Sequence, residues 1–423
     1  MPTPAPLGAS PTTDDTAVYG RTFWLAYLAN TLLVLANALT FRFAELIHYL
    51  GGSERTAGDI VAAALTLSVM ARLSVSHVID DYGTRRMWIL CSILYVGGCG
   101  MFITARDLSW WIYAARMAFV VGLTGMFACS MTHIQNHVPP HRRTEIIGNL
   151  GSSGFIGMIL GSNIGDWILS VVPEGRMQFV ALFGGAAALG VLYLGVVTLI
   201  TQGQRHQVPE LSPPAYRLLI RHWPGAVVIV ALLMGLGISV TTVFLTRFAT
   251  RQNIEGIGIF FTGYALSAFV FRISAQNWGR TIGRHWMLVR GLLGHAVGHL
   301  MLAFVTQGWQ LVLPSIVCGF GHALLFPGVV SLGAGAFPRQ ARGSGTAITL
   351  GFVDFGSVLF APILGRLIVG FGFQTMFLAC SAITFAAAVG YSVIAWRYPD
   401  EEASAGAGES GSAGAGEVVV NPS

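Results

Sequence analysis

The sequence RLSVSHVIDDYGTRR, residues 72–86, joins two apolar runs at 57–79 and 87–105. Each run has about the 20 residues that a helix needs to cross a bilayer. Lipid offers no hydrogen-bond partners to a backbone, so a crossing segment must be a helix or belong to a closed barrel. The short polar break around Gly83 therefore predicts a tight turn between two spanning helices at one membrane surface.

The composition of the whole chain agrees with this interpretation. Hydrophobic residues make up 54% of the 423 residues and charged residues only 10%, whereas a soluble domain has about 25% charged residues. A soluble globule is excluded, and disorder would need the opposite balance. The sequence predicts an all-α polytopic membrane protein with twelve spans, at 23–49, 57–79, 87–105, 110–136, 145–171, 178–200, 224–248, 257–278, 286–306, 309–335, 345–370 and 373–397.

The basic residues indicate how the spans are oriented. All 24 are arginines, scattered between apolar runs in a way that does not favour nucleic-acid binding. Thirteen lie in one set of loops and at the chain ends, against four in the opposite set. The positive-inside rule places both termini in the cytoplasm. We expect a disordered N-terminus at 1–20, a six-helix bundle at 21–200, a cytoplasmic linker at 201–222, a second bundle at 223–398 and a disordered tail at 399–423.

An internal repeat appears when the chain is shifted by 200 residues. The matching pairs are Arg21 and Arg221, Arg72 and Arg272, Gly83 and Gly283, Arg142 and Arg342, Gly151 and Gly351, and Phe155 and Phe355. One constant offset across five spans predicts two similar bundles related by a pseudo-two-fold axis along the membrane normal. Secondary transporters are often built this way, with the binding site between the repeats.

These features resemble the major facilitator superfamily, particularly its bacterial drug- and sugar-efflux-like branches. Residues 72–86 are similar to the family's loop G-x-x-x-D-R-x-G-R-R, with Ser76, Asp81 and Thr84 as departures. Residues 319–338 and 342–365 resemble spans ten and eleven. The resemblance implies a twelve-helix fold that works by alternating access, with spans one, four, seven and ten lining the cavity.

Two groups of residues are candidates for the conformational gate. The resemblance implies a latch between the halves from Asp80, Gly83 and Arg86, together with Arg85; the alternative is positive-inside anchoring. The second copy, Gly283 and Arg284, has Arg280 in place of the acid. Arg72 and Arg272 occupy equivalent places in spans two and eight, where they could close the inner gate or bind an anionic group.

Span five has a ladder of three glycines, Gly157, Gly161 and Gly165, in two overlapping GxxxG units. Such units let helix backbones approach closely, so we expect tight packing on another helix. The ladder also resembles the family's antiporter motif, although Ser162 and Asp166 depart from it.

Ionisable residues within spans are costly, and so they point to function. Arg42 and Glu45 share one helix face at i,i+3. Glu45 could exchange a proton under the influence of Arg42 or Arg116, or it could form a fixed bridge with Arg42. Asp354 is a second candidate for proton coupling or substrate contact; the alternative is a buried acid satisfied by neighbouring Ser/Thr or Arg272. Further candidates for the substrate pathway are Asn37 and His322.

Other activities find little support in the sequence. His295 and His299 form HxxxH but lack an evident third ligand, so we expect no metal and no cofactor. A chain without Lys cannot hold a Walker A motif, which rejects ATP-driven pumping. The sequence contains no HExxH motif, and so this motif gives no support to an enzyme.

The sequence therefore predicts a secondary active transporter of the bacterial inner (plasma) membrane, moving a small organic solute by proton-coupled export. Its partners would be the solute, protons and lipid, without nucleic acid, and the chain would be monomeric. An uptake permease and a transporter-like sensor without transport remain as alternatives.

Overall fold

The computed structural model describes residues 20–137, 143–203, 215–275, 278–338 and 342–397. Most of the expected terminal tails fall outside these ranges. Within them, the side chains at 73–81, 132, 134–137, 143–149, 215, 279–280 and 342–343 also lie outside the description.

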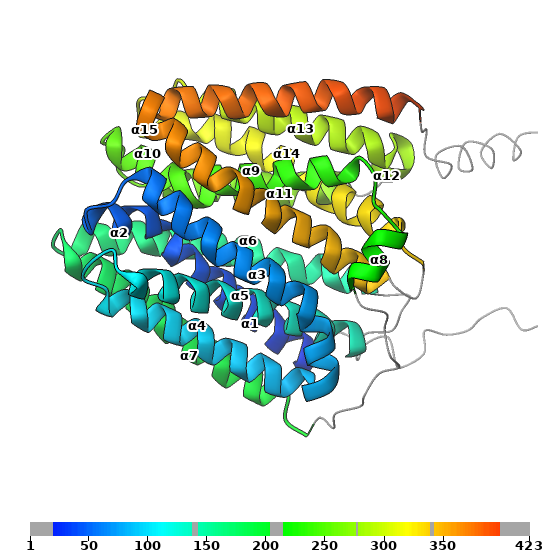
Figure 1. Cartoon of the computed structure of the whole chain (residues 1–423), viewed down its shortest axis with the longest axis horizontal. Helices are drawn as coiled ribbons and strands as arrows, with labels where there is room; N and C mark the ends of the chain where they lie inside the picture. Colours follow the sequence, from blue (N-terminus) through cyan, green and yellow to red (C-terminus); the bar gives the residue numbers. More distant parts are fainter. Residues whose placement is uncertain (1–19, 138–142, 204–214, 276–277, 339–341, 398–423) are drawn as a thin grey trace, which may run out of the picture.

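The first half of the chain folds as a bundle of long helices, one for each predicted span (Figure 1). The first span is interrupted by a short 3-10 turn, η1. The elements are α1 (Arg21–Leu39), η1 (Thr40–Arg42), α2 (Phe43–Tyr49), α3 (Glu54–Tyr82), α4 (Thr84–Thr104), α5 (Trp110–His137), α6 (Arg143–Val171) and α7 (Arg176–Ile200).

The second half repeats this pattern, and its first span is interrupted by η3, a π-helical turn, 200 residues after η1. The elements are α8 (Ala215–Arg221), α9 (Val227–Ser239), η3 (Val240–Phe244), α10 (Leu245–Arg251), α11 (Gly258–Ser274), α12 (Trp278–Thr281), α13 (Arg284–Leu302), η4 (Gly308–Leu311), α14 (Val312–Gly335) and α15 (Arg342–Arg397). Gly372 breaks α15 into two crossings with a φ of 85°.

The described helices together make twelve crossings close to the predicted runs, which confirms the predicted fold. By length and composition alone, eight described stretches qualify as spans, one of them being the double crossing of α15. The helices that fall short are α3, α11 and α13. Helix α11 has only 17 residues, and α3 and α11 carry the in-span arginines Arg72 and Arg272.

The turn glycines of the repeat have the same geometry in both halves. Gly83 has a φ of 86° and Gly283 a φ of 91°, and each directly precedes a helix. A residue with a Cβ rarely adopts this left-handed φ, so each glycine permits a one-residue connection between two helices.

The two bundles join through two helix pairs, α3 against α15 and α6 against α11. We call the end with Arg21 and Arg397 the terminal end, and the opposite end, with the loop at 50–53, the distal end. In Figure 1 the bundles lie close together at the distal end, on the left, and diverge toward the terminal end. The arginine count predicts that the distal end faces outside.

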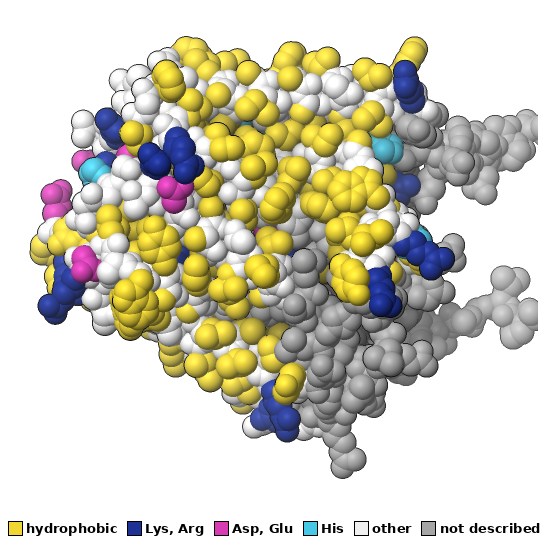
Figure 2. All heavy atoms as spheres, in the orientation of Figure 1, with side chains coloured by type: hydrophobic (Ala, Val, Ile, Leu, Met, Phe, Trp, Pro, Cys, Tyr) yellow, Lys and Arg dark blue, Asp and Glu magenta, His cyan; other side chains and the backbone are white. Residues whose placement is uncertain are grey.

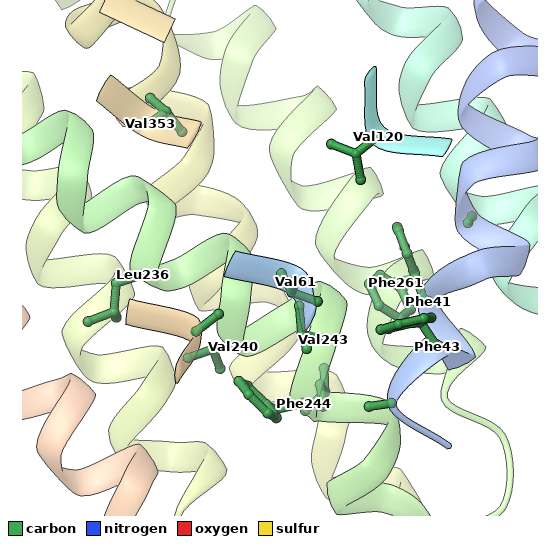
Figure 3. Packing of buried hydrophobic residues seen from close by; sticks show 14 of the residues in the cluster. Phe41, Phe43, Val61, Val120, Leu236, Val240, Val243, Phe244, Phe261 and Val353 are labelled. Atoms are coloured by element: carbon green, nitrogen blue, oxygen red, sulfur yellow. The ribbon is translucent and has the colours of Figure 1, made fainter. Parts of the chain in front are cut away.

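The surface and the core have the distribution expected of a membrane protein. Apolar side chains cover the middle of the face in Figure 2, and charged side chains gather toward the two ends. Inside, one hydrophobic cluster extends through both halves, including Phe41 and Phe244 (Figure 3). Phe41 and Phe261 come from opposite halves, and their ring centroids lie 4.9 Å apart.

Candidate functional site

The distal end holds a first set of polar contacts centred on Arg42. Its guanidinium donates to Glu45 at 2.9 Å and also to Asp166 of α6. The other carboxylate oxygen of Asp166 accepts the backbone N–H of Gly258, at the start of α11. The hydroxyl of Thr250 on α10 donates to Glu45 at 3.2 Å. Both acids are therefore bonded to Arg42 and to the opposite half of the molecule.

The bridge between Arg42 and Glu45 matches one of the two sequence interpretations. The described contacts of Glu45 are with Arg42 and Thr250, whereas Arg116 lies against Phe43 and Phe119. Asp166, which the sequence analysis treated only as a departure from a motif, is the second carboxylate of this cluster. Asn37 lies about one helical turn before Arg42, and its backbone carbonyl accepts a hydrogen bond from the hydroxyl of Thr40 at 2.7 Å.

A second set of ion pairs connects α3 to the other half at the same end. The carboxylate of Glu54 pairs with Arg247 of α10 at 3.1 Å, and both side chains are about 90% buried, with 8% and 10% exposed. Asp59 pairs with Arg366 of α15 at 3.0 Å. We call these contacts, together with the Arg42 cluster, the distal latch.

Backbones approach very closely at the distal latch. A Cβ added to Gly58 of α3 would lie 2.4 Å from the carbonyl oxygen of Ala361, and one added to Gly365 of α15 would lie 2.4 Å from that of Glu54. Only glycine fits at such distances. The ion pairs and these contacts together hold the two halves closed at the distal end.

Farther toward the terminal end, Arg72 and Asp354 form an ion pair between the halves. The Nε and Nη2 atoms of Arg72 lie 2.9 Å and 2.7 Å from one carboxylate oxygen of Asp354. The sequence offered Asp354 no local base and suggested Arg272 as a partner. That suggestion is wrong, because α15 packs against α3 rather than α11 at this level.

Arg272 occupies the corresponding place on α11, where no described carboxylate pairs with it. Its guanidinium lies 5.1 Å from the ring centroid of Phe155 on α6 and 5.4 Å from that of Phe326 on α14. Its Nε atom is buried and has no hydrogen-bond partner among the described residues. His322, also on α14, stacks beside Phe326 and Tyr264, with ring centroids 5.9 Å and 5.6 Å apart.

Arg116 lies inside the first bundle. Its guanidinium carbon is 4.4 Å from the ring centroid of Phe43 and 5.1 Å from that of Phe119. The Nε and Nη1 atoms are buried, and no described residue forms a hydrogen bond with them.

The glycine ladder of span five packs within the first half. A Cβ on Gly157 would lie 2.6 Å from the carbonyl of Thr31, and one on Gly161 would lie 2.5 Å from that of Leu35, so α6 and α1 are in backbone contact. Gly165 does not share this role, because an added Cβ there would find only ordinary contacts at 3.8 Å.

The expected terminal latch falls partly outside the description. The side chain of Asp80 is not described, and those of Arg85 and Arg86 are exposed. Arg284 donates to Ser331 of α14 at 3.4 Å. The latch assigned to Asp80, Gly83 and Arg86 therefore stays a prediction.

His295 and His299 face the interior of the second bundle rather than its periphery. A Cβ on Gly237 of α9 would lie 2.8 Å from Nδ1 of His295, and both imidazoles are buried. Gly237 has no side chain, and this leaves room for the imidazoles to pack inward.

An apolar groove of about 650 Å³ opens on the outside of the second bundle, between the distal ends of α13 and α14. It is lined by Met301, Phe304 and Leu313 and contains none of the ionisable groups above. This position is suited to contact with lipid, so we do not include it in the candidate pathway.

Two six-helix halves, close glycine contacts between them and ion pairs across their interface are typical of a membrane transport protein. The family model described as Major Facilitator Superfamily matches residues 22–257 and again 227–420. The chain belongs to this superfamily, whose fold works by alternating access, and it is a transporter rather than an enzyme.

Curated relatives include efflux proteins. The chain is 24% identical over 321 residues to the tetracycline resistance protein, class B, of Escherichia coli, covering 72% of this chain and 78% of that one. It is 23% identical over 327 residues to the multi-drug resistance efflux pump PmrA homolog of Lactococcus lactis subsp. lactis, covering 74% and 76%.

Solved structures share the fold. The nucleoside transporter NupG has a TM-score of 0.70 at 14% identity, covering 88% of this chain and 98% of that chain. The D-xylose-proton symporter has a TM-score of 0.69 at 17% identity, covering 90% and 98%.

Proposed function

We propose that this chain exports a small organic solute from a bacterial cell in exchange for protons. It would act as a monomer in the inner membrane, with the terminal end in the cytoplasm. The observation that carries the proposal is the ion pair between Arg72 and Asp354, because it joins the two halves and contains a group that can take up a proton.

Protonation of Asp354 links proton movement to the movement of the halves. The charged carboxylate holds α3 against α15 through Arg72, and a bound proton removes the negative charge that forms this contact. Removing one partner of a buried pair costs about 3–5 kcal/mol, and a proton crossing the membrane supplies about 2.3 kcal/mol per 100 mV. The two quantities are of similar size, so protonation can shift the balance between two arrangements of the halves.

The distal latch adds a second set of candidate proton sites. Glu45 and Asp166 share Arg42, and both also bond to the opposite half. Opening the distal end must break the contacts to Thr250 and Gly258. Protons from outside would favour this opening by neutralising the two carboxylates.

Export is favoured over uptake by the relatives that are efflux proteins, including one named for tetracycline resistance and one for multidrug efflux. We therefore assign tetracycline-type and other small organic molecules as the first solutes to test.

The test uses everted membrane vesicles with an acidic interior, supplied with tetracycline, ethidium, uridine, xylose or 1-naphthalenesulfonate. We expect at least one solute to accumulate only when the gradient is present. Asp354→Asn should abolish accumulation while preserving exchange of preloaded solute, and Asp107→Asn, an exposed loop acid, should behave as wild type.

Three outcomes would contradict the proposal. Equal accumulation with and without the gradient, unchanged in Asp354→Asn, would remove proton coupling. Accumulation in right-side-out vesicles alone would make the chain an uptake permease. Binding of a solute without any flux would identify a sensor instead.

A further inference from the structure

Arg272 and Arg72 occupy the same place in the two halves. They are 200 residues apart, as are the glycines that they lie against on the opposite half. A Cβ on Gly351 would lie 3.7 Å from Cδ of Arg72, and one on Gly151 would lie 3.3 Å from Nη1 of Arg272. The two guanidiniums therefore enter the interface between the halves at equivalent positions.

The two positions differ in one group, the carboxylate. Asp354 pairs with Arg72, and the residue equivalent to Asp354 in the first half is Gly154, which has no side chain. In the described part of the chain, Arg272 has no ion pair, and two aromatic rings face its guanidinium. The Nε atom of this guanidinium is buried without a partner among the described residues, and rings compensate the charge only in part, so an anionic partner would stabilise it.

Among the side chains that the structure describes around Arg272, none supplies this anion. His322 lies beside the Phe326 ring that faces Arg272, and Tyr264 lies beside His322. An imidazole and a phenol carry no negative charge at neutral pH. The rings of Phe155 and Phe326 come from opposite halves of the molecule, so the group that binds Arg272 would contact both halves.

We propose that Arg272 binds the anionic group of the transported solute, at the place that a carboxylate fills beside Arg72. The solute is then a small organic anion, a carboxylate or sulfonate, whose apolar body packs against Phe155 and Phe326. Arg binds such groups through two parallel hydrogen bonds. This assignment rests on the proposed transport function, and it concerns the solute class rather than the coupling ion.

The repeat also suggests a substitution that would supply a carboxylate to Arg272 from the chain itself, without any solute. A Cβ on Gly154 would meet only Asn30 Nδ2 and Val34, both at 3.7 Å, which is ordinary van der Waals contact. Gly154→Asp would place a carboxylate at the position equivalent to Asp354. Gly154→Asn has the same size without the charge and is the matched control.

The first experiment measures binding to the purified chain in detergent, without any gradient, by equilibrium dialysis. The probes are benzoate and 1-naphthalenesulfonate, with benzamide as the neutral isostere of benzoate. We expect at least one anion to bind at least about tenfold more tightly than benzamide, as for a hydrogen bond to a charged group. Arg272→Gln should remove this preference and Arg272→Lys should keep part of it, whereas Arg290→Gln, an arginine over the Trp278 ring, should change nothing.

The second experiment needs no solute. Gly154→Asp should raise the melting temperature relative to Gly154→Asn, and this difference should vanish when Arg272→Gln is added. The same Gly154→Asp substitution should weaken anion binding at least about tenfold, because its carboxylate competes for the guanidinium.

The outcomes separate this inference from the proposed function. Absence of any preference for the anions over benzamide, or a preference that survives Arg272→Gln, would overturn the anion site. Anion binding that depends on Arg272, combined with transport indifferent to the proton gradient, would retain the site and reject proton coupling.

Discussion

At the scale of single residues, several charged side chains in the described part of the chain form ion pairs that cross between the halves. Glu54 and Arg247 are the most buried pair of the distal latch, and each belongs to a different bundle. The sequence does not point to this pair, because Glu54 lies at the end of its span and nothing local indicates its partner. By contrast, the i,i+3 spacing of Arg42 and Glu45 was sufficient to suggest their bridge.

We predict that Glu54→Gln destabilises the closed distal end by about 3 kcal/mol, because it leaves the guanidinium of Arg247 buried without a negative partner. The double variant Glu54→Gln/Arg247→Gln should lose less than Glu54→Gln alone, since it removes both charges. Denaturant unfolding of the purified protein measures the two losses. Additive losses in the double variant would show that the pair contributes no coupling.

At the scale of helices, the sequence predicted all twelve crossings but not their interruptions. Hydropathy identifies a crossing because lipid forces every backbone group into a helix. The turns η1 and η3 interrupt the α-helical geometry of two spans whose apolar pattern is continuous. They meet at the distal end, where the hydroxyl of Thr246 donates to the backbone carbonyl of Phe41 at 3.1 Å. The positions of these turns therefore depend on a contact between the halves, which the local sequence does not predict.

The glycine ladder gives a prediction at this scale. Gly161→Ala should destabilise the protein by about 1–3 kcal/mol, because its Cβ would collide with the backbone of α1. Gly165→Ala should be neutral or slightly stabilising, since its Cβ finds ordinary contacts at 3.8 Å. Thermal unfolding in detergent compares the two variants directly, and an equal effect of both would contradict the packing of α6 on α1.

At the scale of the whole molecule, the two halves form one closed distal end. The side chains of Asn163 on α6 and Thr262 on α11 face each other there, with Nδ2 and Oγ1 2.9 Å apart. Transport by alternating access requires these helices to separate at this end during each cycle.

We predict that a disulfide between Asn163→Cys and Thr262→Cys stops transport. Oxidation should reduce turnover at least about tenfold, because separating the halves then requires breaking a covalent bond, and a reductant should restore it. Each single cysteine variant is the control, and the five native cysteines are all buried. Full turnover of the oxidised double variant, with the cross-link verified, would exclude opening at this end.

The sequence by itself determined the class of fold, the twelve spans, the six-plus-six repeat and the turn glycines, because membrane solvation and backbone geometry act locally. It also identified Arg72, Arg272 and Asp354 as important, because a charge within a span is costly wherever it lies. Only the tertiary structure decided that Asp354 pairs with Arg72, that Asp166 joins Arg42, and that Arg272 meets two aromatic rings. Partnership between residues far apart in the chain depends on which helices pack together, and that packing is a property of the whole molecule.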